Sequence, residues 1–148
     1  MFGADHTKAL IEINQGSRSK YEIDKETGFL TLDRELLMPY PANYGFIPKT
    51  FSYDGDALDI FVVSHYPINP LTVVRYDVVG LVLMTDRGVI DNKILAKLPG
   101  YNGKIPIDEI EFFLTKYKTG VDIMDIIISP EEAELEIELA RGMYENIK

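Results

Sequence analysis

The sequence predicts an α+β domain, and two observations support this prediction. Short segments rich in β-branched and aromatic residues occupy the chain up to residue 98 and are separated by turn signals. Two segments with apolar residues at helical spacing follow, one over residues 105–118 and one from residue 130 onward. At 148 residues, of which 46% are hydrophobic, the chain is expected to form a single domain, residues 1–148, around one core.

The composition argues against several classes of protein. The absence of Cys excludes disulfides and thiolate metal sites, and it fits a reducing compartment. No window of about 18 residues is apolar throughout, and the N-terminus carries no signal pattern, so we expect a cytoplasmic protein with no membrane partner. The net charge of −9 disfavours nonspecific binding to nucleic acid.

Three strands are expected first, over residues 8–13, 19–23 and 29–34. Turn signals separate them, so we expect a meander that puts Glu12, Lys20 and Arg34 on neighbouring strands. Each of these charged residues, taken alone, is typical of a solvent-exposed face.

Residues 35–50 are expected to be irregular, because three prolines in this segment forbid a long helix or a central strand. The same segment holds Tyr40 and Tyr44 shortly before a cluster of acids. Two Tyr hydroxyls on a stiff loop can bind an anion, or the rings can serve only to fill the core. The sequence leaves both interpretations open.

The most informative stretch places Asp54, Asp56 and Asp59 directly before an apolar strand, residues 60–63. Acids this close raise one another's pKa unless a cation lies among them. Oxygen ligands of this kind, together with substrate phosphates, are what Mg²⁺ takes in proteins. The residues alone leave a second interpretation, a polar turn whose Asp side chains cap backbone groups.

Two nearly continuous strands are expected over residues 73–79 and 80–85, and a hairpin follows at 86–93. With a four-residue loop, Asp86 and Asp91 are cross-strand partners on one face, and Lys93 lies on that face too. Two acids directly opposite each other destabilise a hairpin unless a cation lies between them. The hairpin is therefore a second candidate metal site.

The helix expected over residues 105–118 carries Lys118 at its end, where the helix dipole favours cations. Residues 121–128 are apolar but contain two acids, and their structure is ambiguous. Ser129 begins a capping-box pattern with Pro130 at the first helical position, which predicts the start of the second helix.

Taken together, these motifs resemble the soluble family I inorganic pyrophosphatases. The pattern Asp-Gly-Asp-x-x-Asp at residues 54–59 resembles that family's signature. Six further blocks occur in the family's order, with spacings that fit closely up to about residue 98. These blocks are Ile-Glu-Ile at 11–13, Lys-Tyr-Glu at 20–22, Asp-Arg at 33–34, Tyr-Pro-Ala-Asn-Tyr-Gly at 40–45, Met-Thr-Asp at 84–86 with Asp91 and Lys93, and Tyr-Lys at 117–118.

The resemblance implies a small closed five-stranded β-barrel similar to an OB-fold, with additional hairpin strands and two flanking helices. It implies hydrolysis of inorganic pyrophosphate to two orthophosphates, with roughly three to four Mg²⁺ per active site. By the same resemblance, Asp54, Asp59 and Asp91 hold the first Mg²⁺, and Asp59 also reaches the second. Asp86 with Asp91 holds a metal that arrives with the substrate, and Glu12 supports a further one through water.

The resemblance also assigns the remaining roles. Asp56 is the general base that takes a proton from the attacking water. The residues that bind the two phosphates are Lys20, Arg34, Tyr44, Tyr117 and Lys118. Lys20, Arg34, Tyr44 and Lys93 also act in catalysis, the cations by screening charge on the leaving phosphate. Glu22, Tyr40 and Lys93 orient or neutralise their neighbours, and the protein is expected to be a homo-oligomer, with a hexamer favoured.

The chain departs from the family pattern in three places. Arg87 and Val89 stand where the family usually has acids, so metal affinity or metal choice can differ. The segment after Ala96 is shorter than expected, and residues 121–124 replace the family's usual Lys and Trp. These changes affect the expected oligomer contacts and the rim of the pocket rather than the central acids.

Three other functions are alternatives to pyrophosphate hydrolysis. An EF-hand needs Gly at its sixth position and Glu at its twelfth, but counting from Asp54 these are Asp59 and His65. An OB-type nucleic-acid binder needs a basic groove, which the acidic balance opposes. A pyrophosphate or nucleotide binder without catalysis is the stronger rival, because the departures near Asp86 can mark decay. Neither His6 nor His65 has metal-ligand spacing.

Overall fold

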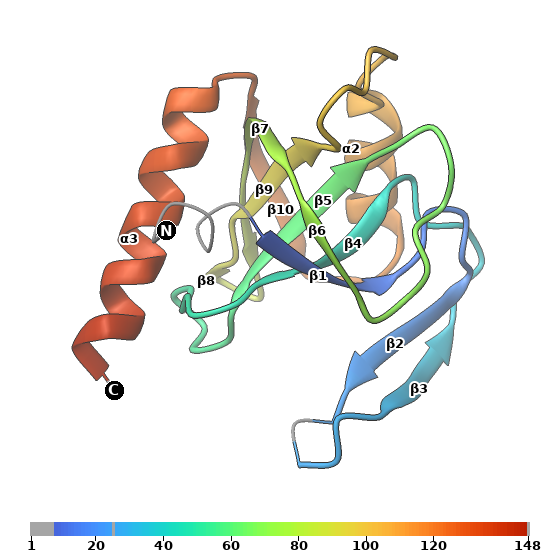
Figure 1. Cartoon of the computed structure of the whole chain (residues 1–148), viewed down its shortest axis with the longest axis horizontal. Coiled ribbons are helices and arrows are strands. Elements are labelled where there is room, and N and C mark those ends of the chain that lie inside the picture. Colours follow the sequence, from blue (N-terminus) through green and yellow to red (C-terminus); the bar gives the residue numbers. More distant parts are fainter. Residues whose placement is uncertain (1–7, 25, 148) are drawn as a thin grey trace.

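The computed structural model describes residues 8–24 and 26–147, and it shows an α+β fold made mostly of strands (Figure 1). The elements in chain order are β1 (Lys8–Ile13), β2 (Ser19–Ile23), β3 (Leu30–Glu35), β4 (Asn43–Ile47), β5 (Leu58–Val63), β6 (Thr72–Arg75), β7 (Asp77–Asp86), β8 (Val89–Ile90), β9 (Lys93–Lys97), α2 (Ile107–Lys116), β10 (Val121–Ile127) and α3 (Pro130–Ile147). Among these residues, no helix is both long and apolar enough to cross a membrane.

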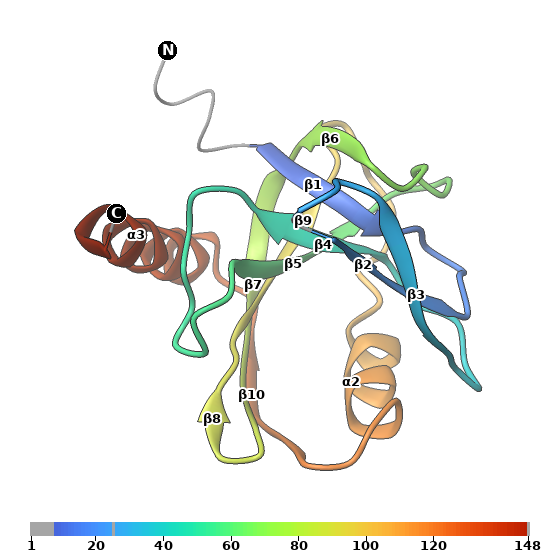
Figure 2. The same cartoon turned by 90° about the horizontal axis from the view of Figure 1, so that it is seen from below.

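One curled sheet contains most of the strands, in the order β10-β7-β9-β5-β4-β1-β6, with β8 paired to β7 outside this path. Among the described strands, β5 and β9 alone pair in parallel. β6 and β7 are far apart in this order, yet Tyr76 alone separates them along the chain, so the sheet must curl strongly (Figure 2). No ladder joins the outer strands β6 and β10 within the described residues, so the closed five-stranded barrel is not confirmed.

The predicted meander of the first three strands is wrong. β1 pairs with β4 and β6, whereas β2 and β3 pair only with each other in a separate two-stranded ribbon. The first three strands form where they are predicted, but turn signals do not specify which neighbour a strand pairs with. Long-range pairing gave β1 two partners from later in the chain, and the ribbon projects from the sheet beside it (Figure 1).

A central strand also forms where the sequence analysis excluded one. β4 lies between β1 and β5, in a window bounded by Pro41 and Pro48, neither of which belongs to the strand. Within it, Gly45 lies so close to β1 that a Cβ atom there would stand 1.8 Å from the backbone oxygen of Leu10. The absence of a side chain at Gly45 is therefore what lets the two backbones approach.

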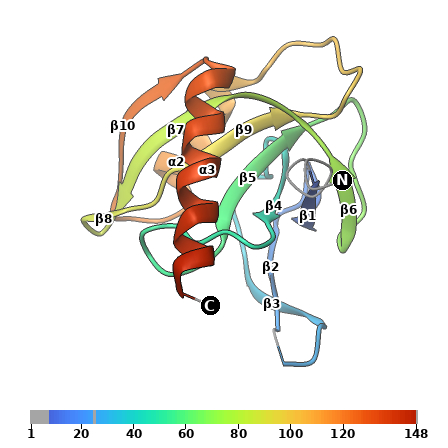
Figure 3. The same cartoon turned by 60° about the vertical axis from the view of Figure 1, so that its left-hand side comes forward.

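Both faces of the sheet are covered by helix. Ile60 and Val62 of β5 belong to the core cluster under α3, and Phe61 and Val63 belong to the cluster under α2. Burial on both faces explains why β5 is wholly apolar after Asp59 rather than alternating. The two helices lie on opposite sides of the sheet, with α3 packed against β7 (Figure 3).

The helix boundaries follow the sequence signals closely. The Oγ atom of Ser129 accepts a hydrogen bond from the backbone N–H of Glu132 at 3.3 Å, which confirms the predicted N-cap of α3. α2 covers Ile107–Lys116, slightly less than the predicted range, with Pro106 at its N-cap position. The ambiguous segment after it forms the edge strand β10.

Candidate active site

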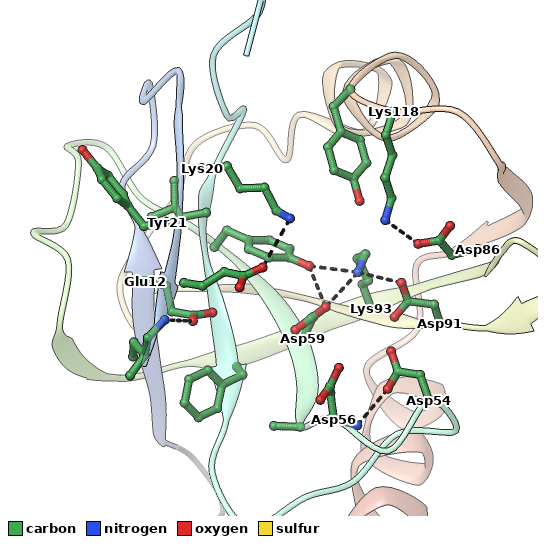
Figure 4. Close-up of a pocket in the computed structure, with 17 residues that line it drawn as sticks. Glu12, Lys20, Tyr21, Asp54, Asp56, Asp59, Asp86, Asp91, Lys93 and Lys118 are labelled. Atoms are coloured by element: carbon green, nitrogen blue, oxygen red, sulfur yellow. Dashed lines mark hydrogen bonds and ion pairs between the residues drawn. The ribbon is translucent and has the colours of Figure 1, made fainter. Parts of the chain in front are cut away.

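A cavity of about 430 Å³ opens between the curled sheet, the β2–β3 ribbon and the end of α2 (Figure 4). Every predicted site residue lines it except Arg34 and Tyr40. The predicted residues that do so are Glu12, Lys20, Glu22, Tyr44, Asp54, Asp56, Asp59, Asp86, Asp91, Lys93, Tyr117 and Lys118. The rest of the lining, to which no role was assigned from the sequence, is formed by Ile13, Tyr21, Ile23, Phe46 and Ala57.

Lys93 is the centre of the polar contacts in this cavity. Its side chain is only 2% exposed, and its Nζ donates to Tyr44 Oη at 2.9 Å, Asp59 Oδ2 at 2.9 Å and Asp91 Oδ2 at 3.3 Å. Tyr44 Oη in turn donates to the same Asp59 oxygen at 2.7 Å. Burial alone would lower the pKa of Lys93, but the carboxylates of Asp59 and Asp91 outweigh it and raise that pKa.

The two strands that carry this cluster are neighbours. β5 and β9 pair in parallel, with Ile60 opposite Ile94, so Asp59, the second residue of β5, lies beside Lys93, the first residue of β9. Their side chains point to the same face because the pairing sets them in register. This explains how residues far apart in the sequence meet in an ion pair.

The turn before β5 holds two acids that differ in their hydrogen bonding. Gly55 has φ +87°, a conformation that favours glycine, and it places Asp54 and Asp56 on either side of a tight bend. Asp54 Oδ1 accepts hydrogen bonds from the Ser52 hydroxyl and, at 3.0 Å, from the backbone N–H of Asp56. The Asp56 carboxylate makes no hydrogen bond or ion pair within the described residues and faces the cavity (Figure 4).

The hairpin at Asp86 has a different register from the predicted one. β7 and β8 are joined by a two-residue turn, Arg87–Gly88, with both φ angles positive, so Asp86 pairs with Val89 rather than with Asp91. Positive φ at both positions defines a type I′ turn, which matches the twist of the strands. Asp91 still lines the cavity, because it follows β8 and its backbone N–H donates to the carbonyl oxygen of Met84 at 2.9 Å.

Asp86 is partly paired. Its Oδ2 forms an ion pair with Lys118, whereas its Oδ1 is buried and has no hydrogen-bond partner in the described structure. Burial lowers the pKa of Lys118, but its hydrogen bond to Asp86 more than compensates, so the net shift is upward. A buried carboxylate oxygen without a donor is costly, and a cation beside it would remove that cost.

The ribbon supplies the remaining charges. Lys20 Nζ lies 2.9 Å from Asp33 Oδ2 and 3.6 Å from Glu22 Oε1. The hydrogen bond from Lys20 lowers the pKa of Asp33, a residue that the sequence analysis quoted in a motif but gave no role. Glu12 Oε2 accepts from the backbone N–H of Ile23 at 3.4 Å, which ties β1 to the ribbon.

Two predicted residues lie outside the cavity. Arg34 is exposed, and its Nη2 donates to the carbonyl oxygen of Tyr117 at 3.4 Å. Tyr40 is buried, with its ring centroid 5.6 Å from that of Tyr44 and 4.5 Å from that of Phe113.

His65 does not line the cavity. His6 lies outside the described residues. His65 is exposed, contacts Asn102 Oδ1 at 3.1 Å through Nε2, and packs its ring against Tyr101. Neither observation gives His65 a role at the acidic cluster.

The donor set suits a hard divalent cation, although no three carboxylates among the described residues are close enough together to form a ready metal cluster. The acids around the cavity offer only oxygen ligands, which Mg²⁺ prefers. Burial, assisted by Asp59 and Asp54, raises the pKa of Asp91 to about 6 despite the opposing effect of Lys93. The buried Asp91 carboxyl and the unpartnered Asp86 oxygen are therefore both groups that a bound cation would stabilise.

A second cavity of about 410 Å³ adjoins the first and shares its acidic wall. Asp54, Asp86, Asp91 and Lys118 line both cavities, and the second adds the two residues that depart from the pattern, Arg87 and Val89. Arg87 and Val89 therefore lie at the rim of the acidic site.

Carboxylates that face lysines across one cavity are typical of enzymes that act on phosphate groups with hard divalent cations. The fold and the site together define a protein of that class. A family model described as inorganic pyrophosphatase matches residues 9–102. The chain belongs to the inorganic pyrophosphatase family and is, by that membership, an inorganic diphosphatase, a class of hydrolase.

Individual relatives agree with this assignment. The chain is 36% identical to soluble inorganic pyrophosphatase 2 of Chlamydomonas reinhardtii, over 92% of the chain and 79% of that protein. It is 43% identical to the inorganic pyrophosphatase of Caulobacter vibrioides over 80% of the chain, but spans only 64% of that relative. The crystal structure of the Thermus thermophilus inorganic pyrophosphatase superposes with a TM-score of 0.86 at 34% identity, covering 93% of this chain and 90% of the other.

Proposed function

We propose that the 430 Å³ cavity is where this single-domain protein hydrolyses inorganic pyrophosphate to two orthophosphates. The observation that carries the proposal is the convergence of Asp54, Asp56, Asp59, Asp86 and Asp91 on one cavity that lysines also line. Family membership supplies the substrate, and the cavity supplies the groups that its hydrolysis needs.

The proposed metal ligands are Asp54, Asp59 and Asp91, with Asp86 and Asp91 for a further ion and Glu12 acting through water. Mg²⁺ is the proposed cofactor. When bound, such ions lower the pKa of water and neutralise phosphate charge. Lys93 forms ion pairs with Asp59 and Asp91, so both carboxylates are held in position before any metal ion binds.

Asp56 is the proposed general base. Its carboxylate faces the cavity and has no hydrogen bond in the described structure, so it is free to accept a proton. In the proposed reaction the water oxygen bonds to one phosphorus as Asp56 takes a proton from that water. The bond from this phosphorus to the bridging oxygen breaks, and the second phosphate leaves with the bridging oxygen.

Lys20, Lys118, Tyr44 and Tyr117 are the proposed phosphate-binding groups. All four line the cavity, and Lys20 and Lys118 carry the charge that the leaving phosphate needs. Arg34 joins them in this proposal only after its side chain leaves the carbonyl oxygen of Tyr117.

The proposal is tested by phosphate release from pyrophosphate with Mg²⁺, before and after exhaustive chelation. We expect release with Mg²⁺ and none after chelation, because without the ion the attacking water keeps its high pKa and the carboxylates repel the anionic substrate. Full release after chelation would overturn the metal requirement. Binding of pyrophosphate without release would show a binder that has lost catalysis.

A further inference from the structure

Two strands, β8 and β9, pair with the same edge of β7, and Asp91 and Asn92 interrupt the pairing between them. β8 ends at Ile90 and β9 begins at Lys93, so the two residues between them belong to neither strand. β7 pairs with β8 through Thr85 and Asp86, and with β9 through Val82 and earlier residues. The stretch of β7 between these pairings therefore faces the interruption.

The Asn92 side chain takes the place of the missing backbone pairing. Its Oδ1 accepts a hydrogen bond from the backbone N–H of Met84 at 3.1 Å. The carbonyl oxygen of Met84 accepts from the backbone N–H of Asp91 at 2.9 Å. Both backbone groups of Met84 are thus bonded to the interruption, and the first of these bonds depends on the orientation of one amide side chain.

Glu136 on α3 fixes that orientation. Asn92 is 7% exposed, and its Nδ2 donates to Glu136 Oε2 at 3.0 Å. Glu136 is itself held in place, because its helix buries Ala133, Ile137 and Ala140 against the core. The acceptor therefore comes from a rigid element on the far side of β7 from α2.

We propose that Glu136 and Asn92 are positioning residues for the acidic site. Asn92 lies between Asp91 and Lys93 in the chain, so its anchoring sets where both of those side chains enter the cavity. The metal-binding role of Asp91 rests on the proposed function, whereas the anchoring of the interruption does not. Partners that orient a metal ligand typically contribute about 10–100-fold to metal affinity or activity.

The first test compares Glu136→Ala with Glu136→Gln, which keeps an oxygen acceptor for Asn92. Glu138→Ala is the matched control, since it removes an exposed carboxylate from the same helix. We expect Glu136→Ala to weaken Mg²⁺ binding, measured by calorimetry, by about tenfold. Glu136→Gln and Glu138→Ala should stay within about threefold of the parent. Unchanged Mg²⁺ affinity in Glu136→Ala would overturn the proposal.

Amide hydrogen exchange of Met84 in the metal-free protein gives a readout that does not depend on the proposed function. Protection of this amide should fall in Glu136→Ala and persist in Glu136→Gln and Glu138→Ala, because only the first leaves Asn92 without its acceptor. A protein that does not hydrolyse pyrophosphate can still pass this test. Equal protection in all three variants would show that Glu136 does not hold Asn92.

The last variant exchanges donor and acceptor. Asn92→Asp places a carboxylate against that of Glu136. Adding Glu136→Gln restores a hydrogen bond in which the new amide at position 136 donates and the new carboxylate at position 92 accepts. The double variant has the same net charge as the parent. We expect the double variant to recover Met84 protection and Mg²⁺ affinity to within about threefold of the parent. A double variant that resembles Glu136→Ala would contradict the role of this contact.

Discussion

Lys93 Nζ and Tyr44 Oη both donate to one oxygen of Asp59, at 2.9 and 2.7 Å. That oxygen is saturated with donors, so the second oxygen of Asp59 is the one left for other ligands. The buried lysine is thus a permanent cation beneath acids that would otherwise repel one another. Its charge is needed most when no other cation is present.

Lys93→Met should therefore destabilise the metal-free protein strongly and the Mg²⁺-bound protein less. Removing one partner of a buried ion pair typically costs about 3–5 kcal/mol, since Asp59 and Asp91 are left uncompensated. Mg²⁺ binding to the native state restores part of that loss. Denaturant unfolding with and without Mg²⁺ measures both, with the exposed Lys116→Met as control. A loss that is the same in both conditions would contradict this account.

Asp56→Asn should lose turnover while it keeps Mg²⁺ affinity, because Asp56 makes no side-chain hydrogen bond in the described structure and is assigned as the base. Loss of a general base costs about 10²–10⁴ in rate. Asp59→Asn should lose both properties. Turnover, calorimetric Mg²⁺ affinity and the thermal midpoint separate the two variants. Parent-like turnover in Asp56→Asn would refute the assignment of the base.

Mg²⁺ affinity should fall as the pH drops through 6. The pKa of Asp91 is raised to about 6 in the folded protein, chiefly by burial, so this carboxyl binds a proton more tightly than in the unfolded chain. The stability that this proton gives the metal-free protein is present at low pH and is lost as the pH rises through 6.

Mg²⁺ competes with that proton, so at pH 5 its affinity should be about tenfold weaker than at pH 7. Calorimetry at both pH values measures the change, and Asp91→Asn should lack it. Equal affinity at both pH values would mean that Asp91 is ionised throughout this range.

Arg87→Asp should raise Mg²⁺ affinity. Arg87 lines the second cavity beside Asp86 and Asp91, so its replacement by an acid reverses a charge at the rim of the site. A change of two charges near a divalent ion gives a gain on the order of three- to tenfold at low salt. Asp tolerates the positive φ of this turn position. The exposed Arg75→Asp is the control, and an equal gain there would indicate net charge alone.

We propose that the protein is a homo-oligomer, with a hexamer favoured by analogy with bacterial members of the family. The expected result is a mass several times that of the 16.8 kDa chain in light scattering at micromolar concentration. A monomeric mass would refute the proposal. The altered segment after Gly120 belongs to edge strand β10, so we expect contacts with other subunits to differ most from those of other family members there.

Both helices and most of the strands could be predicted from local signals, whereas β4 and β10 could not. Asp59 ahead of an apolar run, and Ser129 ahead of Pro130, each carry their own structural information. Strand partners could not be predicted in this way, because pairing depends on contacts between distant segments. β1 illustrates this point, since its neighbours are β4 and β6 and not the strand that follows it.

Two misses at the site have local causes. The prolines around β4 predict that no central strand forms there, but Pro41 and Pro48 only bound the strand. The sequence predicts a hairpin loop of four residues, whereas Arg87 and Gly88 both adopt positive φ and form a two-residue turn. Arg34 shows a further limit, because a motif match does not say whether a long exposed side chain points into the cavity.

Gly45 has no group that could bind an ion, a phosphate or a proton, yet it directly follows Tyr44, whose hydroxyl bonds to Asp59. Any side chain there would force β4 away from Leu10 and carry that hydroxyl with it. In a saturation screen that selects for growth or turnover, this position would be as intolerant as the carboxylates. Maps of mutational tolerance for this protein would thus mark backbone contacts as strongly as chemistry, and the two can be separated only by assaying folding alongside activity.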